Sequence, residues 1–294
     1  MSAVLTSTTA STPVASLDTS ATGLVVKPLE PTIGAEISGV DLREPLSIAQ
    51  RDQIKAPLLK HRVLFFRDQP INHAQQLAFA RQFGKIYAHP STRTLDNRFD
   101  ASTAEAHRIS ATETRKHYKV TAGRWHTDTS WLVRPAWGAV LREVDIPALG
   151  GDTIWANGHA VYESLSDELK AKIADLHVVH DFQSSLKRVG LDYPIVAHPL
   201  VRVHPETGEK ILWINFSQNP SVIGWDRADS AALVAELERA YSKPEFQVRF
   251  KWSKHALAFW DNRAGLHYPV SNYGDYPREL ERVLVEDFDA LPHY

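Results

Sequence analysis

Two histidines and one aspartate in this chain have the residue types and spacing that suit a divalent metal ion. His126 and Asp128 lie two residues apart, and His267 follows near the other end of the chain. Side chains two residues apart point to the same face of a strand, so the first pair can reach one ion. Two imidazoles and one carboxylate typically hold iron(II) on one face and leave the other face open for oxygen and a cosubstrate. The pattern predicts oxidation chemistry at such an iron centre.

The neighbouring residues distinguish this pattern from ordinary surface polarity. A lone His-x-Asp on a strand is usually only a polar stretch of surface. Here Trp125 and Thr127 flank the ligand pair, and a second distinctive segment, 260–267, ends in the distant histidine. We therefore interpret the three residues as metal ligands, and we interpret most of the 14 histidines as structural or surface groups.

The composition is that of a globular protein without thiol chemistry. The 294 residues are 43% hydrophobic and 23% charged, which provides enough apolar content for a buried core. The absence of cysteine excludes disulfides, thiolate metal ligands and a cysteine nucleophile, and it is compatible with a reducing cytoplasm. The formal net charge of −2 predicts no nucleic-acid partner. No apolar run approaches the roughly 20 residues of a membrane span, so we expect a cytoplasmic protein without membrane contacts.

Two segments stand out from the remaining chain. Residues 1–22 are rich in Ser, Thr and Ala and lack the basic start and apolar centre of a secretory signal. We expect a disordered tail there and a single domain over 23–294. Residues 88–123 are polar and turn-rich, and a long segment of this kind is often functional, for example as a lid.

Short strands dominate the predicted secondary structure. Phe246, Val248, Phe250 and Trp252 alternate with other residues, as a strand with one buried face requires. Strands with interspersed helices indicate a mostly β fold, and we expect a jelly-roll core, that is, a double-stranded β-helix. Further strands are predicted at 24–29, 35–42, 63–66, 137–144, 153–155, 177–182, 200–204, 210–215, 256–260 and 281–288.

Four helices are predicted between these strands. Ser47 and Gln50 form a possible capping box for the first helix, which Pro57 should kink or end. Asn72 can cap the second helix, and Gly84 should stop it. The other two are predicted at 160–176 and 229–241.

Several short motifs together resemble the taurine/2-oxoglutarate dioxygenase family (TauD/TfdA). Each motif is weak alone, but they occur in the family's order from about residue 24 to residue 288. The resemblance implies a jelly-roll enzyme that uses Fe(II), 2-oxoglutarate and O2. The matching segments are Gly-Ala-Glu-Ile-Ser-Gly-Val at 34–40, Phe-Phe-Arg-Asp-Gln at 65–69, Trp-His-Thr-Asp at 125–128, Gly-Gly-Asp-Thr at 150–153, His-Pro-Leu-Val-Arg-Val-His-Pro at 198–205 and Trp-Asp-Asn-Arg at 260–263.

The resemblance assigns roles to residues at matching positions. His126, Asp128 and His267 match the family's iron ligands. Thr153 and Arg278 match the threonine and arginine that bind the far carboxylate of 2-oxoglutarate. A planar guanidinium suits a carboxylate better than an ammonium would.

The substrate-binding assignments depend on the same resemblance. Arg282 and His89 match residues that hold the anionic group of sulfonate and sulfate-ester substrates, and Thr129 and Phe216 are further candidates for the substrate pocket. Taurine itself is disfavoured, because positions that bind its amine in taurine enzymes are Thr92 and Ala122 here.

Three functions compete at this stage. The first is oxidation of a small anionic molecule, in its best version an alkyl sulfate ester or sulfonate, with release of sulfate or sulfite and an aldehyde. The second is a biosynthetic hydroxylase or desaturase for an amino-acid-like or aromatic carboxylate. The third is a non-catalytic protein that kept the fold, and the complete residue set disfavours it. A homodimer or homotetramer is compatible with each function.

Overall fold

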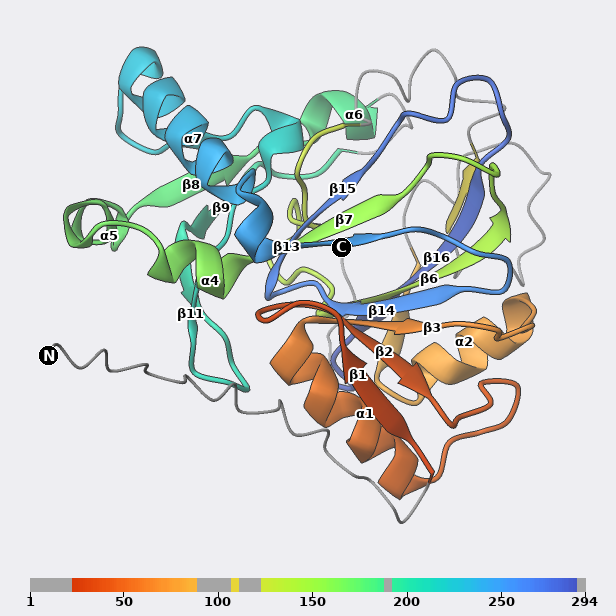
Figure 1. Cartoon of the computed structure of the whole chain (residues 1–294). Coiled ribbons are helices and arrows are strands. Elements are labelled where there is room, and N and C mark those ends of the chain that lie inside the picture. The colour runs from red at the N-terminus through yellow and green to blue at the C-terminus, as the bar shows by residue number, and fades with distance from the viewer. Residues whose placement is uncertain (1–22, 89–106, 111–122, 188–191, 290–294) are drawn as a thin grey trace, which may run out of the picture.

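The computed structural model describes residues 23–88, 107–110, 123–187 and 192–289 (Figure 1). The predicted tail at 1–22, most of the predicted lid and His89 lie outside the described residues. Within the described part, one large sheet and one small sheet form the centre of the molecule.

The large sheet has eight strands in the order β1-β2-β3-β14-β6-β16-β4, and β5 pairs with β16. Its pairs are antiparallel except for β2 and β3, which run parallel. The strand bounds are β1 Val25–Pro28, β2 Ala35–Ser38, β3 Val63–Phe66, β4 Lys85–Tyr87, β5 His107–Ser110, β6 Gly138–Asp145, β14 Leu257–Asp261 and β16 Glu279–Glu286.

The small central sheet has the order β13-β7-β15, and both of its pairs are antiparallel. Two peripheral sheets, β12-β8-β9 and β10-β11, lie on the side of the molecule that carries most helices (Figure 1). The bounds are β7 Thr153–Asn157, β8 His177–His180, β9 Val196–Pro199, β10 Val201–Val203, β11 Lys210–Leu212, β12 Ser221–Val222, β13 Gln247–Phe250 and β15 Gly265–Pro269.

Strand β3 shows why the large sheet is buried on both faces. All four of its residues are 0% exposed. Because neighbouring side chains on a strand point to opposite faces, Leu64 and Phe66 join a core under two helices, whereas Val63 and Phe65 join the core against the small sheet. Phe65 stacks on Phe250 of β13 with ring centroids 4.1 Å apart. The two central sheets therefore enclose one apolar core, as a jelly roll does.

Helices cover the two outer sides of this sandwich. Helices α1 and α2 pack on the outer face of the large sheet, and α4, α5 and α7 gather beside the peripheral strands (Figure 1). The bounds are α1 Ile48–His61, α2 His73–Arg81, α4 Gly158–Glu163, α5 Asp167–Ile173, α6 Gln183–Lys187 and α7 Arg227–Tyr241, with 3-10 turns η3 Phe216–Gln218 and η4 Pro244–Phe246.

Both predicted capping boxes are confirmed. Ser47 and Gln50 bond each other's backbone at the start of α1, as Asn72 and Gln75 do at the start of α2. The expected break at Pro57 is wrong as an end point, because α1 continues to residue 61 with Pro57 buried inside it. Packing of this helix on the sheet outweighs the lost hydrogen bond.

Several predicted boundaries are also wrong. The single helix expected at 160–176 is two helices, because Ser166 caps a new helix after a turn. Phe246 lies in a 3-10 turn, so the strand expected from that residue begins at Gln247. The turn-rich segment 88–123 contains strand β5, and strands β9 and β15 were not predicted.

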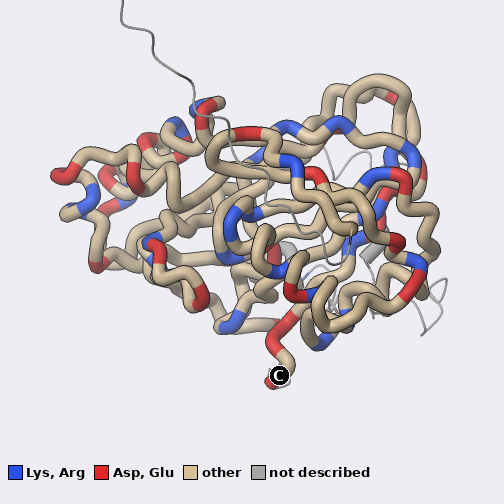
Figure 2. The backbone as a smooth tube through the Cα atoms, turned by 60° about the horizontal axis from the view of Figure 1, so that its bottom comes forward, with Lys and Arg blue, Asp and Glu red and all other residues tan. Residues whose placement is uncertain are grey.

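Charge is distributed evenly in the view of Figure 2. Basic and acidic residues are intermixed over the tube there, without a face of one sign. Among the described residues, no helix is long and apolar enough to span a membrane.

Candidate metal centre

The three predicted ligands come together at one place. His126 lies in the segment before β6, and His267 lies in the middle of β15. Their backbones form an isolated antiparallel bridge, in which the backbone N–H of each residue donates to the carbonyl oxygen of the other, with nitrogen-to-oxygen distances of 2.9 and 2.8 Å. Potential ligand atoms of His126, Asp128 and His267 all lie within 4.8 Å of one another. The bridge fixes the spacing that sequence alone left open.

Hydrogen bonding orients the His126 ring. Its Nδ1 lies 3.0 Å from the carbonyl oxygen of Arg124, so Nδ1–H donates to that oxygen in the neutral ring. The lone pair of Nε2 is then available to a metal. This arrangement is typical of metal-binding histidines, whose second nitrogen is held by a neighbouring acceptor.

The electrostatic environment favours the neutral form of both imidazoles. Burial lowers the pKa of His126, and the opposing effect of the Asp128 carboxylate is smaller. Burial also lowers the pKa of His267 well below its ordinary value, and the neighbouring His126 and Arg282 lower it further. Neutral imidazole is the form that binds a metal, so the site suits a cation.

Asp128 offers a carboxylate oxygen to this cluster. Its side chain is 5% exposed, and its Oδ2 is buried with no hydrogen-bond partner among the described residues. Its Oδ1 accepts a hydrogen bond from Nη1 of Arg282. A buried carboxylate oxygen without a donor is costly unless a cation satisfies it. The donor set and this oxygen therefore fit iron(II).

Asn262 locks the segment that carries the aspartate. Its Oδ1 accepts from the backbone N–H of Asp128 and from Oγ1 of Thr127, both at 2.9 Å. Its Nδ2 donates to the carbonyl oxygens of Asp128 and Ala136, also at 2.9 Å. The side chain of Asn262 is buried, and its amide uses both donor hydrogens and both acceptor positions of its oxygen.

The predicted oxoglutarate anchor lies on the same face of the small sheet as His267. His267 is paired with Trp155 across β7 and β15, and Thr153 lies two residues from Trp155. Residues opposite each other, and residues two apart, share one face of a sheet. Thr153 is therefore a neighbour of the metal ligand on that face.

Arg278 is fixed beside that threonine. Its Nε donates to the carbonyl oxygen of Gly151 at 2.8 Å, and its Nη2 donates to Oγ1 of Thr153 at 3.3 Å. The Nε1 of Trp252 donates to the same hydroxyl at 3.0 Å. Arg278 is 4% exposed, so its guanidinium is preorganised in a buried place where a carboxylate would gain most from it.

The predicted substrate residues are less uniform in their placement. Arg282 on β16 bonds the carboxylate of Asp128, one of the candidate metal ligands. Thr129 is buried, and its hydroxyl donates to the Asp128 carbonyl and accepts from the Ala136 N–H. Phe216 is 1% exposed and packs against Tyr241, and it borders a pocket that Arg124 also lines. Their roles toward a substrate stay predictions.

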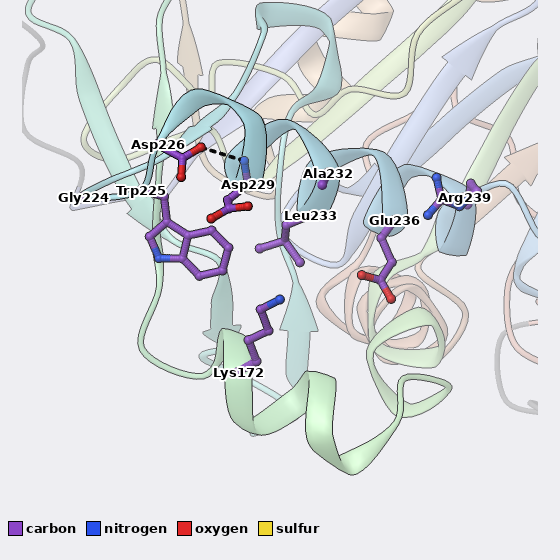
Figure 3. Close-up of a pocket in the computed structure, with 9 residues that line it drawn as sticks. All are labelled: Lys172, Gly224, Trp225, Asp226, Asp229, Ala232, Leu233, Glu236 and Arg239. Carbon is purple, nitrogen blue, oxygen red and sulfur yellow. Dashed lines mark hydrogen bonds between the residues drawn. The ribbon is translucent and has the colours of Figure 1, made fainter.

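A separate pocket of about 620 Å³ lies between α5 and α7 (Figure 3). Lys172 and Trp225 face it from one side, and residues of α7 such as Glu236 line the other side. None of its lining residues belongs to the metal cluster or to the Arg278 site. The volume of a pocket alone therefore does not identify the candidate active site of this protein.

Comparison with known proteins agrees with the geometry of the metal cluster. The model of the family described as taurine catabolism dioxygenase TauD, TfdA family, matches residues 26–284. The chain belongs to the TauD/TfdA family. Membership confirms the predicted resemblance and the predicted jelly-roll, mostly β fold class.

Relatives within the TauD/TfdA family show what kind of enzyme this is. The chain is 34% identical over 279 residues, 89% of each protein, to an alpha-ketoglutarate-dependent sulfate ester dioxygenase from Pseudomonas putida. It is 32% identical to an alpha-ketoglutarate-dependent 2,4-dichlorophenoxyacetate dioxygenase from Cupriavidus pinatubonensis over 91% of this chain and 99% of the relative. The crystal structure of a taurine dioxygenase from Burkholderia xenovorans has a TM-score of 0.76 and 39% identity over 90% of each chain. The predicted class, a 2-oxoglutarate-dependent dioxygenase, is confirmed.

Family membership implies iron(II), oxygen and 2-oxoglutarate, and the structure contributes the His-Asp-His cluster that fits the metal.

Three supporting residues were not predicted from the sequence. Asn262 was visible inside the Trp-Asp-Asn-Arg motif, but its clamp on Asp128 was not predicted. Trp252 and Gly151, which hold Thr153 and Arg278, carried no signal for that role because their partners are distant in the sequence.

Proposed function

We propose that this TauD/TfdA enzyme binds iron(II) with His126, Asp128 and His267, and binds the far carboxylate of 2-oxoglutarate with Arg278 and Thr153. The observation that carries the proposal is the His-Asp-His cluster, together with a buried arginine that bonds Thr153 on the face of the small sheet that carries His267. When bound there, iron and 2-oxoglutarate supply the oxidation of a substrate C–H bond by oxygen. The protein supplies orientation, charge and a dry environment.

We propose a small organic anion as the substrate, in the first place an alkyl sulfate ester or sulfonate. Support comes from the relative named for sulfate esters and from the position of Arg282 beside Asp128. A guanidinium there can bond the substrate's anionic group while still contacting the metal-binding carboxylate. The neighbouring C–H bond would then be held near the metal.

The products follow from the position of attack. Hydroxylation of the carbon that bears the ester oxygen or the sulfur gives an unstable adduct. Its new hydroxyl loses a proton and becomes a carbonyl while the bond to the sulfur group breaks. An alkyl sulfate would therefore yield an aldehyde and sulfate, and a sulfonate would yield an aldehyde and sulfite.

An aryloxy carboxylate is the second candidate. It is favoured by the 32% identity to the 2,4-dichlorophenoxyacetate enzyme, of which 99% is covered. Arg282 can bind a carboxylate as readily as a sulfate, because both present paired oxygens to its guanidinium. The same oxidation would release a phenol and the corresponding oxo acid.

Succinate formation tests both candidates. The enzyme is loaded with iron(II) without oxygen, supplied with 2-oxoglutarate, and exposed to air with alkyl sulfates, alkylsulfonates or phenoxyacetates. We expect alkyl sulfates or sulfonates to stimulate succinate formation, with an equal release of sulfate or sulfite. Stimulation by phenoxyacetates alone, with phenol release, would select the second candidate. Failure to bind iron would contradict the metal assignment itself.

A further inference from the structure

A small cavity is lined in part by residues that hydrogen-bond to the segment around Asp128, a candidate metal ligand. Its volume is about 180 Å³. Two residues of its wall, Ala136 and Asn262, also belong to the clamp on Asp128. The lining also includes the two arginines Arg134 and Arg202 and the ring of Trp213. None of the three metal ligands lines the cavity.

Arg202 is the unusual group in this cavity. It is half-buried, and its guanidinium lies over the ring of Trp213, with Cζ 4.5 Å from the ring centroid. Burial lowers the pKa of Arg202, and the charge of Arg263 lowers it further. Within the described part of the chain, Arg202 has no carboxylate partner and no hydrogen-bond acceptor. A guanidinium removed from water without an anion is costly.

Four other poorly exposed arginines do not share this situation, and a fifth, Arg278, bonds the carbonyl of Gly151 and the hydroxyl of Thr153. Arg62 bonds Glu209, and Arg142 bonds Glu281. Arg282 bonds Asp128, and Arg263 is held by Asp261 and Glu206. These four guanidinium groups are each matched with a carboxylate of the chain, whereas Arg202 is not, so an external anion could take the place of that carboxylate.

The other charges around the cavity agree with this assignment. Arg134 is exposed, and it has no charged partner in the described ranges. Arg263 lines the cavity, but Asp261 and Glu206 already neutralise it. Asp287 is the carboxylate in the lining of this cavity, and it is exposed and forms no ion pair with Arg202 or Arg134. Arg134 and Arg202 therefore leave positive charge available to a ligand.

The rim of the cavity is apolar. Val133 is 75% exposed and Val203 is 63% exposed, although both are hydrophobic. Pro135 and Pro205 lie next to them in the lining. Exposed apolar residues beside a cavity that cationic side chains also line are compatible with a site for an amphiphilic small molecule.

We propose that this cavity binds a small organic anion, with its carboxylate or sulfate on Arg202 and its apolar part between Val133 and Val203. The site is separate from the metal cluster and does not depend on the proposed reaction. A planar guanidinium can bond two oxygens of either oxyanion, so carboxylates and sulfates share the chemistry required.

Calorimetric binding of benzoate tests this site, with hexyl sulfate as the second probe. The full-length enzyme carries iron(II) and saturating 2-oxoglutarate under nitrogen, so the Arg278 site is occupied. We expect saturable binding of benzoate to the wild type. Arg202→Gln should weaken the benzoate affinity about tenfold or more, because one charge-assisted pair is lost. Arg202→Lys keeps the charge without the planar fork, so it should bind with intermediate affinity.

Three controls separate this site from other cationic positions. Arg239→Gln removes the same charge from the exposed side of α7 and should bind benzoate like the wild type. Arg282→Ala should also retain the Arg202-dependent binding, because Arg282 does not line the cavity. Benzyl alcohol, which lacks the charge, should not compete. Equal benzoate affinity of the wild type and both folded Arg202 variants would overturn the proposal, as would loss of all binding in Arg282→Ala alone.

Discussion

At the residue scale, the two oxygens of Asp128 have different surroundings. Oδ1 accepts from Arg282, whereas Oδ2 is buried without a partner among the described residues. Arg278 has a different environment, fixed by Gly151 and Thr153 away from that carboxylate. The two arginines should therefore fail in different ways when they are replaced.

The first prediction separates these arginines by kinetics. Arg278→Ala should raise the KM for 2-oxoglutarate about tenfold or more, because a buried charge-assisted pair is lost. Arg282→Ala should raise the KM for the anionic substrate and leave slow substrate-free oxoglutarate decarboxylation intact. Steady-state succinate assays measure both quantities. The same defect in both variants would contradict the division of roles.

The second prediction concerns Asn262, whose side chain makes four hydrogen bonds to the segment around Asp128. Asn262→Ala should reduce the free energy of unfolding by about 2–4 kcal/mol, because buried backbone groups lose their partners. It should also weaken iron binding, because Asp128 is no longer held.

Gln69→Ala is the matched control for Asn262→Ala. Gln69 is another buried amide, and it bonds backbone groups of Leu42, Val40 and Arg67. It should lose comparable stability by denaturant titration while keeping its iron affinity in an anaerobic iron(II) titration. Unchanged iron affinity in Asn262→Ala would show that the clamp is purely structural.

At the element scale, the position of β15 decides where His267 lies. The strand pairs tightly with β7, and Gly265 is paired with Asn157. A Cβ built on Gly265 would lie 1.9 Å from the carbonyl oxygen of Ala156, which is backbone and cannot rotate away. Only glycine lets the two strands approach this closely.

The third prediction follows from this contact. Gly265→Ala should displace β15, reduce the free energy of unfolding by about 1–3 kcal/mol and weaken iron binding. Gly208→Ala is the control, because its Cβ would meet nothing within 4 Å although its φ of +73° is strained. The control should lose about 1 kcal/mol and bind iron normally. Thermal unfolding and iron titration of both variants provide the measurement, and a normal iron affinity in Gly265→Ala would count against the argument.

At the scale of the whole molecule, two buried histidines make stability depend on pH. Burial lowers the pKa of His180 to about 3 and that of His198 to about 4. Both nitrogens of His180 lack hydrogen-bond partners in the described structure, and its ring stacks on Trp213 at 5.2 Å. In the unfolded chain these rings take up protons below about pH 6.5, whereas the folded protein excludes those protons until lower pH.

The fourth prediction is the sign and size of this dependence. Because the unfolded state binds more protons, stability should fall as pH decreases from 7 to 5, by about 2 kcal/mol from His180 alone. His180→Phe keeps an aromatic ring on Trp213 but cannot be protonated. From pH 7 to pH 5 the variant should therefore lose about 2 kcal/mol less free energy of unfolding than the wild type. Urea titrations at both pH values measure the difference. His177→Phe, an exposed histidine on the same strand, should match the wild type, and equal losses in the wild type and His180→Phe would contradict the prediction.

Prediction from the sequence succeeded where a signal is local. The capping boxes at Ser47 and Asn72 are confirmed because cap and partner lie three residues apart. Pro57 misled the prediction because tertiary packing of α1 on the sheet offsets a local cost. Strand β15 was missed because 265–269 has no clean alternation, and its partner β7 is far away in the sequence.

The sequence by itself determined the enzyme family, the types of the three candidate metal ligands and the charge of the predicted anchor residues. These depend on residue identity and on short spacings, which the chain carries directly. Tertiary structure decided the bridge between His126 and His267, the hydrogen bonds of Asn262 to the segment of Asp128 and the lack of an ion-pair partner for Arg202 among the described residues. Each of these depends on backbone paths that bring distant segments together, and the free energy of burying the core, rather than any local pattern, selects those paths.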